Sequence, residues 1–260
     1  MHPVAFSIGS FDIHWYGIFV AIGFILGLWT AGRRGLIDGL SQDKTADLGP
    51  WIILGALIGA RTFYVVTFWE EDFAGKSLIN IFKLRQGGLV FYGGFIGAVI
   101  STIIYTRRNQ VPLWKLADTF APSVALGHAF GRLGCLMTGC CYGKECALPW
   151  AITYPSDHIT HPHAVHPTQI YESVFNLVLY AGLAFLYRKK QFDGQVFAVY
   201  LMAYAVLRAG VEGLRGDYAD QNFTGLLTPG QQVGILVFTA GIVLYVFQKR
   251  RAKPTATPEK

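Results

Sequence analysis

Residues 13–34 read IHWYGIFVAIGFILGLWTAGRR, and this stretch decides the fold class. From Ile13 to Gly32 there is no Lys, Arg, Asp or Glu, and Arg33 and Arg34 follow directly. An α-helix needs about 20 mostly apolar residues to cross the hydrocarbon core of a bilayer. Paired arginines at the end of such a segment are typical of the cytoplasmic side. The stretch therefore predicts a transmembrane helix that ends in the cytoplasm.

Six further segments have comparable length and apolarity, and the overall composition agrees with them. Of the 260 residues, 52% are apolar and 15% are charged, whereas soluble domains carry roughly 25% charged residues. We expect an all-α polytopic membrane protein with seven transmembrane helices, and an ordinary soluble enzyme is excluded. The fourth and sixth helices are the least apolar. The six segments cover residues 48–69, 86–106, 117–134, 167–187, 194–214 and 230–248.

The basic residues predict the orientation of these helices. With the N-terminus outside, every strong basic cluster lies in a cytoplasmic segment, as the positive-inside rule requires. We therefore expect one membrane domain over residues 1–251, with a small extracytoplasmic head at about 135–166, and a polar cytoplasmic tail at 252–260. The net charge of +6 is spread over the clusters, so nucleic acid is not an expected partner. The clusters are residues 33–34, 107–108, 188–190 and 249–251.

Charged side chains within the predicted helices are the first functional signal, because each costs roughly 2.5–3.5 kcal/mol at mid-bilayer. Guanidinium groups outnumber carboxylates among them, and guanidinium binds phosphate oxygens in a bidentate fork. We expect an anion site, with a phospholipid head group as the ligand. The alternative is an ion-pair stripe that joins helices, because residues 208, 212 and 215 share one helix face. The charges are Arg61, Arg132, Glu172, Arg208 and Glu212, with Arg215 at a helix end.

Two motifs accompany these charges. Residues 127–143 are rich in glycine, which allows close backbone approach, and carry Arg132 near the centre. Residues 166–172 read HPTQIYE, with Pro167 at the start of the fifth helix, where its missing N–H does no harm.

These motifs make the chain resemble the phosphatidylglycerol–prolipoprotein diacylglyceryl transferase family. The resemblance extends from about residue 5 to residue 250 and follows the order of the family's motifs. The matching pieces are HWYG at 14–17, GAR at 59–61, GGLVFYGG at 87–94, GRLG at 131–134, HPTQIYE at 166–172, and Arg208 with Glu212 and Arg215.

The resemblance implies a multi-pass enzyme of the bacterial cytoplasmic (inner) membrane that acts in lipoprotein biosynthesis without a metal or other cofactor. Such an enzyme transfers the diacylglyceryl group of phosphatidylglycerol to the thiol of the lipobox cysteine in a prolipoprotein signal peptide. A thioether forms and glycerol phosphate leaves, so the reaction needs a thiolate and a stabilised leaving group. The alternatives are a non-catalytic relative, a seven-helix transporter or receptor that binds an anion, and a membrane redox or metal protein.

The resemblance also implies roles for residues. Arg132 is expected to be the main phosphate ligand and Arg208 the second, and Glu212 is expected to orient Arg208 or Arg215. Tyr16 and Gln169 are expected to line the lipid or peptide site. The remaining substrate-binding residues are Arg61, His166, Tyr171, Glu172 and Arg215.

The general base stays open in the sequence. Tyr92 stands where relatives often have histidine, and it could act only with a positive charge beside it. His128, one helical turn before Arg132, is the other candidate. Plain packing roles are the alternative for both residues.

Four cysteines fall within or beside the expected extracytoplasmic head. Relatives often have asparagine in place of Cys135 and glutamate in place of Cys140. Disulfides are expected in an oxidising compartment, and a metal site is less favoured because no regular zinc spacing is present. A role as nucleophile is disfavoured, because the substrate supplies the thiol. The cysteines are Cys135, Cys140, Cys141 and Cys146.

Overall fold

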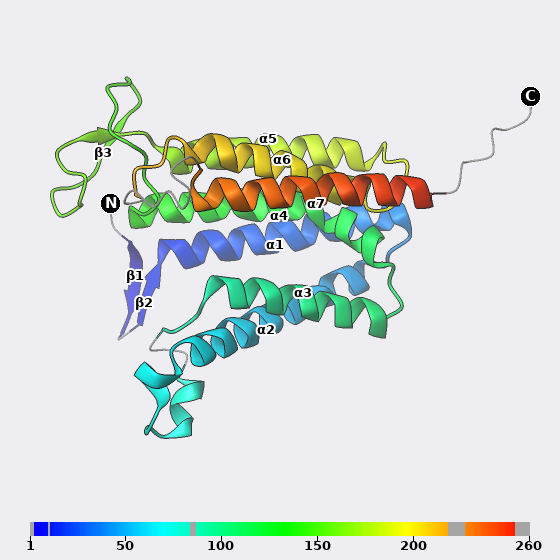
Figure 1. The fold of residues 1–260 in the computed structure, drawn as a ribbon, viewed down its shortest axis with the longest axis horizontal. Helices are drawn as coiled ribbons and strands as arrows, with labels where there is room; N and C mark the ends of the chain where they lie inside the picture. The colour runs from blue at the N-terminus through cyan, green and yellow to red at the C-terminus, as the bar shows by residue number, and fades with distance from the viewer. Residues whose placement is uncertain (1–2, 10, 84–86, 218–226, 253–260) are drawn as a thin grey trace, which may run out of the picture. The chain divides into compact units, whose positions relative to one another are not determined.

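The structure, a computed structural model, describes residues 3–9, 11–83, 87–217 and 227–252. Seven α-helices make up most of this part of the chain, and each overlaps one segment expected from the sequence (Figure 1). The expected polar tail lies outside the described residues apart from Ala252. The helices are α1 (Trp15–Gly35), α2 (Gln42–Thr67), α3 (Phe91–Arg108), α4 (Leu113–Thr138), α5 (Thr168–Tyr187), α6 (Gln195–Glu212) and α7 (Pro229–Arg251).

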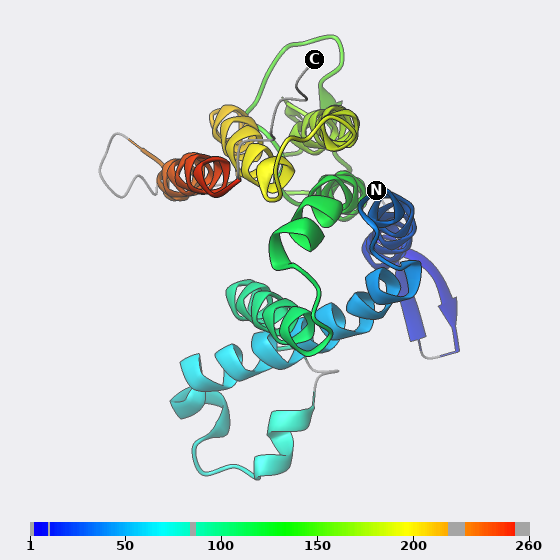
Figure 2. The ribbon, with the colours of Figure 1, turned by 90° about the vertical axis from the view of Figure 1, so that its right-hand side faces the viewer.

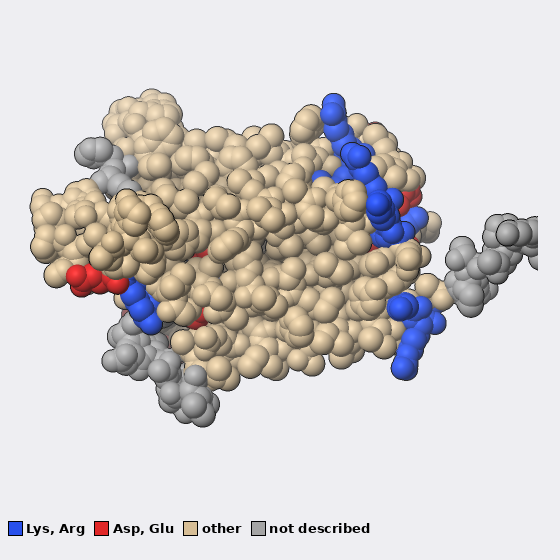
Figure 3. All heavy atoms as spheres, turned by 90° about the horizontal axis from the view of Figure 1, so that it is seen from above, with Lys and Arg blue, Asp and Glu red and all other residues tan. Residues whose placement is uncertain are grey.

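Five of these helices, α1, α2, α5, α6 and α7, are long and apolar enough to cross a membrane. Large apolar side chains stand exposed along α5 and α7; Val178 is 66% and Leu236 is 70% exposed. An apolar surface of this kind is suited to lipid rather than to water. On the face seen in Figure 3, most Lys and Arg side chains gather at the right-hand end, the end at which α7 finishes in Figure 1. The chain is therefore a mostly helical membrane protein.

The chain divides into two compact units, unit 1 being Met1–Ala31 with Ala117–Lys260 and unit 2 being Gly32–Leu116. The helices of unit 1 run with similar axial directions, and α7 packs on α6 and α6 on α5 (Figures 1 and 2). Two alanines of α4 are completely buried in a core that they share with α5 and α6. The buried core consists of Ala121 and Ala125 of α4, Leu183 and Tyr187 of α5, and Val196 and Tyr200 of α6.

Asp118 is one of the charges that lower the apolarity of the fourth predicted segment, and the structure shows what it does. Its side chain is completely buried and accepts hydrogen bonds from the backbone N–H groups of Gly194 (2.8 Å) and Phe197 (2.9 Å) at the start of α6. Lys190 Nζ lies 3.3 Å from the same carboxylate. Asp118 therefore satisfies the free donors at the N-terminus of α6.

Two short antiparallel sheets in unit 1 were not expected from the sequence. β1 (Val4–Ile8) pairs with β2 (Phe11–His14) directly before α1, so that α1 begins at Trp15 rather than at Ile13. β3 (Ile152–Thr153) pairs with β4 (Ala164–Val165) in the segment between α4 and α5. The expectation of an all-α chain therefore missed two hairpins at the end of unit 1 where α1 begins (Figure 1).

Unit 2 is built on the contact of α2 with α3. Each helix presents two glycines four residues apart, Gly55 and Gly59 on α2 and Gly93 and Gly97 on α3. A Cβ at Gly59 would overlap the carbonyl oxygen of Gly93. The small-xxx-small pattern on both sides thus permits backbone contact between the helices. Three short turns, η1 (Leu36–Asp38), the π-helical η2 (Trp69–Phe73) and η3 (Leu78–Phe82), complete unit 2.

Candidate active site

Four charged side chains from three helices of unit 1 form a continuous ion-pair network. Arg132 Nε on α4 lies 2.6 Å from Glu172 Oε2 on α5, and Arg208 Nη1 on α6 lies 3.6 Å from Glu172 Oε1. Arg208 Nη2 also lies 2.6 Å from Oε2 of Glu212, one turn further along α6. The carboxylates are 1% exposed, whereas Arg132 and Arg208 are 14% and 15% exposed. The fold thus brings together four of the five charges predicted within the helices.

The network shows which of the guanidinium groups within the helices have acidic partners. Glu172 and Glu212 match Arg132 and Arg208, and the contact of Glu212 with Arg208 is the expected one. Arg215 is also matched, since its Nε and Nη2 contact the two carboxylate oxygens of Asp217 at 2.9 and 2.6 Å. Asp217 lies just beyond the sixth predicted helix and was not counted. Three carboxylates therefore pair with three of the four guanidinium groups, and the fourth, on Arg61, binds backbone carbonyls instead.

Arg132 keeps part of its guanidinium outside the network. Among the described residues, its polar contacts are with Glu172 Oε2 and with His128 Nε2 at 3.3 Å, and both contacts use Nε. This leaves the two Nη amino groups for a further ligand. Amino groups of a guanidinium suit the oxygens of a phosphate.

The same hydrogen bond limits what His128 does. Because Arg132 Nε–H donates to His128 Nε2, this nitrogen carries a lone pair and no proton. Taking up a proton there would break the hydrogen bond and place a third positive charge beside Arg132 and Arg208. The ring also packs 5.2 Å from the ring of Tyr204, a neighbour that the sequence did not reveal. The geometry favours His128 as a positioning residue for Arg132 over a general base.

The segment after α4 is held by the first turn of α5. Gln169 is buried, and its Nε2 donates to the Cys140 carbonyl at 2.7 Å and to the Tyr154 hydroxyl at 2.9 Å. Burial raises the pKa of Tyr154, so this phenol stays protonated at neutral pH. Thr168 Oγ1 donates to the Cys141 carbonyl at 2.6 Å. Gln169 therefore lies behind the loop rather than at an opening.

Two further residues of the HPTQIYE motif lie together beyond this loop. The hydroxyl of Tyr171 accepts a hydrogen bond from Trp150 Nε1 at 2.7 Å and lies 3.3 Å from His166 Nδ1. The Gly143 N–H donates to the His166 carbonyl at 2.9 Å. A Cβ at Gly143 would lie 2.5 Å from His166 Cβ, so only glycine allows this approach.

Tyr16 lies against α4 close to Arg132. Its side chain is about half exposed, and a Cβ at Gly134 would lie 2.9 Å from the tyrosine ring. Gly134, the last residue of the GRLG motif, therefore makes room for the ring. Tyr16 has the accessibility that a substrate-lining residue needs.

Arg61 is engaged within unit 2. It donates to the carbonyls of Ile81 and Asn80 at 2.7 Å each and to those of Gly87 and Gly88 at 3.0 Å each. Four of its five donors therefore hold η3 and residues 87–88 onto α2. Arg61 was expected to bind substrate, but its hydrogen bonds to these carbonyls leave one N–H donor for a phosphate.

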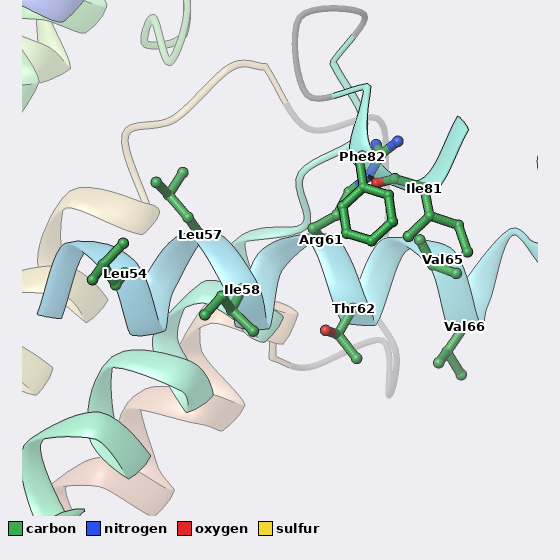
Figure 4. Close-up of a pocket in the computed structure, with 9 residues that line it drawn as sticks. All are labelled: Leu54, Leu57, Ile58, Arg61, Thr62, Val65, Val66, Ile81 and Phe82. Atoms are coloured by element: carbon green, nitrogen blue, oxygen red, sulfur yellow. Dashed lines mark hydrogen bonds between the residues drawn. The ribbon is translucent and has the colours of Figure 1, made fainter. Parts of the chain in front are cut away.

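An apolar pocket of about 440 Å³ lies beside Arg61 (Figure 4). Its lining suits a hydrocarbon chain better than a charged head group. The other residues that line it are Leu54, Leu57, Ile58, Thr62, Val65 and Val66 of α2, with Ile81 and Phe82 of η3.

Tyr92, in the first turn of α3, is 66% exposed, and its ring centroid lies 5.9 Å from that of Phe91. This exposure argues against the packing alternative for Tyr92.

Three of the four cysteines come together where α4 ends. The sulfur atoms of Cys135, Cys140 and Cys141 all lie within 4.8 Å of one another. All four cysteines are free thiols, so the expected disulfides are not formed in this structure. Hydrogen bonds from the thiols of Cys135 and Cys141 lower the pKa of Cys140. The sequence missed this cluster because its spacing, C-x₄-C-C, matches no common metal motif.

Comparison with known proteins agrees with the resemblance seen in the motifs. The sequence pattern of a family described as prolipoprotein diacylglyceryl transferase matches residues 3–247. Three similar proteins are each named phosphatidylglycerol–prolipoprotein diacylglyceryl transferase. One from Finegoldia magna is 37% identical over 252 residues, covering 96% of this chain and 97% of the relative. One from Synechocystis sp. is 36% identical over 95% of this chain and 90% of the relative, and one from Clostridioides difficile is 32% identical over the full length of both. The chain therefore belongs to the prolipoprotein diacylglyceryl transferase family.

Proposed function

We propose that this chain transfers the diacylglyceryl group of phosphatidylglycerol to the lipobox cysteine of prolipoproteins in the bacterial cytoplasmic membrane. The observation that carries the proposal is the buried network of Arg132, Glu172, Arg208 and Glu212 in a chain of this family. The reaction displaces glycerol phosphate from an sp³ carbon. It therefore needs donors that are already in position where negative charge develops on the departing phosphate.

Arg132 is the main donor in this proposal. Glu172 and His128 hold its Nε, so the plane of the guanidinium is fixed before substrate binds. Its two amino groups then bind two phosphate oxygens. Arg208 is the second arginine of the network and is held by Glu172 and Glu212. Its positive charge stabilises the Glu172 carboxylate, which also contacts Arg132.

Each unit, taken by itself, offers one surface suited to a part of the substrates. Tyr16, half exposed beside Gly134, lines the space next to Arg132. The apolar pocket on α2 is suited to an acyl chain, with Arg61 keeping its η3 wall in place. Neither the role of Tyr16 nor that of the α2 pocket requires Arg61 to contact phosphate.

All seven helices cross the membrane in this proposal, with the N-terminus outside and the C-terminus in the cytoplasm. α3 and α4 are not among the five helices that are long and apolar enough by themselves to cross a membrane. α4 carries Asp118, His128 and Arg132, whose polar groups have partners within unit 1. Basic side chains close the last turns of α1, α3 and α7, as the orientation requires. A reporter fused after residue 251 tests this, because activity of a periplasm-specific reporter there would contradict the orientation.

The transferase activity is tested with purified protein in detergent micelles. Phosphatidylglycerol and a lipobox peptide are supplied, and mass spectrometry follows diacylglyceryl addition while glycerol phosphate is measured in parallel. A peptide with serine in place of the lipobox cysteine is the control. Equal amounts of thioether product and glycerol phosphate support the proposal. Binding of the lipid without turnover would instead indicate an anion-binding relative or a transporter.

A further inference from the structure

The end of α4 folds back so that two cysteines meet. Gly139 has φ +76°, its N–H donates to the Leu136 carbonyl at 3.2 Å, and the Cys140 N–H donates to the Cys135 carbonyl at 3.2 Å. These two hydrogen bonds form a Schellman motif, in which the residue after the left-handed glycine returns over the last turn of the helix. An apolar pair commonly makes this contact, and here both positions are cysteine.

A third thiol joins them through an unusual backbone conformation. Cys141 has φ +64°, a region that side-chain-bearing residues rarely adopt. Its carbonyl accepts from Thr168 Oγ1 at 2.6 Å, and the Cys140 carbonyl accepts from Gln169 Nε2 at 2.7 Å. Side chains of α5 thus hold the backbone that brings the third sulfur within 4.8 Å of the other two.

Three sulfurs in this arrangement can supply three of the four ligands of a tetrahedral zinc ion. Zinc binds thiolates at about 2.3 Å in tetrahedral geometry, which places the sulfurs about 3.8 Å apart. The sulfurs are already within 4.8 Å, and Cys140 is exposed, so side-chain rotation suffices. Thiolates are soft ligands that favour zinc over magnesium or calcium. No other group of three or more such ligands is found among the described residues.

We propose that Cys135, Cys140 and Cys141 bind one Zn²⁺ through three thiolates and leave its fourth position to the acceptor thiol of the peptide. The second half of this proposal rests on the proposed transferase function. Catalytic zinc sites have three protein ligands and an open position, whereas structural sites are closed by four. Cys146 is not part of the cluster and does not close this one.

The site lies where the reaction needs a thiolate. Cys135 follows Arg132 by one turn of α4, and the ring of Tyr16 lies against Gly134, between these two residues in the sequence. A thiol that coordinates zinc is deprotonated outright, and its proton passes to solvent. The acceptor sulfur then forms a bond to the glyceryl carbon while the bond from that carbon to the phosphate oxygen breaks, and the electron pair leaves with glycerol phosphate. This supplies the thiolate without His128, whose Nε2 is occupied by Arg132.

The test uses the full chain, reduced and stripped of metal, in detergent micelles, with Co²⁺ as the spectroscopic probe for zinc. We expect a sulfur-to-cobalt charge-transfer band that saturates at one ion per chain and disappears when Zn²⁺ is added. Cys140→Ser and Cys141→Ser should weaken binding by more than the roughly 10–100-fold that loss of an outer-shell partner costs. Cys146→Ser is the matched control and should bind as the wild type does. Gel filtration verifies that each variant remains folded.

The open position is tested by adding lipobox peptide to the cobalt-loaded protein. A fourth thiolate should strengthen the band by about a third, and the serine peptide should leave it unchanged. No saturable band, or equal binding by all three serine variants, would overturn the metal site. A band that the cysteine peptide does not change, or full transfer by metal-free enzyme, would overturn the role assigned to the fourth position. A chain that binds cobalt but transfers nothing would keep the site and lose the proposed function.

Discussion

Arg132→Ala separates the structural role of Arg132 from its role in catalysis. The substitution leaves Glu172, 1% exposed, with Arg208 at 3.6 Å, and Arg208 is already engaged by Glu212 at 2.6 Å. At an effective dielectric constant of about 20, an ion pair at 2.6 Å gains about 6 kcal/mol before desolvation is subtracted, and one at 3.6 Å about 5 kcal/mol. Breaking a buried pair costs about 3–5 kcal/mol net. We therefore expect the melting temperature to fall by roughly ten degrees.

Glu172→Gln supplies the compensating change. In the double variant Arg132→Ala, Glu172→Gln, the remaining network is Arg208 with Glu212, one positive and one negative charge 2.6 Å apart. No buried charge is left without a partner, so most of the lost stability should return. The transfer rate should not return, because loss of one preorganised donor to developing negative charge costs roughly 10²–10³-fold.

The assay measures thermal unfolding and initial transfer rates of the wild type, both single variants and the double variant in the same micelles. We expect stability and rate to separate, with the double variant close to the wild type in melting but at least about a hundredfold slower. A double variant that transfers within about tenfold of the wild type would show that Arg132 acts only as an ion-pair partner. The anion-site argument would then be refuted.

Three further substitutions test particular contacts. Gly93→Ala should lower the melting temperature, because its Cβ would overlap the Gly59 carbonyl oxygen. Gly94→Ala is the control and should leave the melting temperature unchanged, because the nearest neighbour of its Cβ would lie 3.4 Å away. Equal melting of the two variants would contradict the close contact of α2 with α3. His128→Gln keeps an acceptor for Arg132 and should transfer within about tenfold of the wild type, while a general base would lose roughly 10²–10⁴-fold with either Gln or Ala. Arg61→Lys removes most of the donors that hold partly buried carbonyls of η3, so limited proteolysis should cut the η3 segment faster. Unchanged cleavage would count against this role.

Helix positions followed mainly from apolarity, because a helix needs about 20 mostly apolar residues to cross a bilayer, and the basic clusters supported the two least apolar segments. The segment predicted at 117–134 is α4, Leu113–Thr138, even though Asp118 and Arg132 interrupt it. The hairpin before α1 was missed because short strands give a weak signal beside a long apolar run. Gly9, with φ +62°, is the turn residue that could have indicated it.

The site was harder to predict, because charge pairing depends on distances that a sequence does not contain. Counting charges treated Arg61 and Arg132 alike, yet Arg61 binds carbonyls 19 to 27 residues away along the chain. The partner of Arg132, Glu172, is 40 residues away and was itself among the counted charges. Similarly, the thiol cluster depends on the positive φ of Gly139 and Cys141, which no spacing rule reveals.

A neutral network is the arrangement that an enzyme working on an anionic lipid inside a membrane requires. Two unmatched guanidinium groups would each be costly to insert into a bilayer, and they would bind the ground-state phosphate so firmly that little of the binding energy favoured the transition state. With Glu172 and Glu212 in place, the network inserts without net charge, and the Nη groups of Arg132 remain as oriented donors. Negative charge on the departing phosphate increases as the carbon–oxygen bond breaks, so these donors gain most at that moment. Balanced charge at rest and preorganised donors for the leaving group are therefore compatible, and an anion site in this network does not need an excess of guanidinium groups.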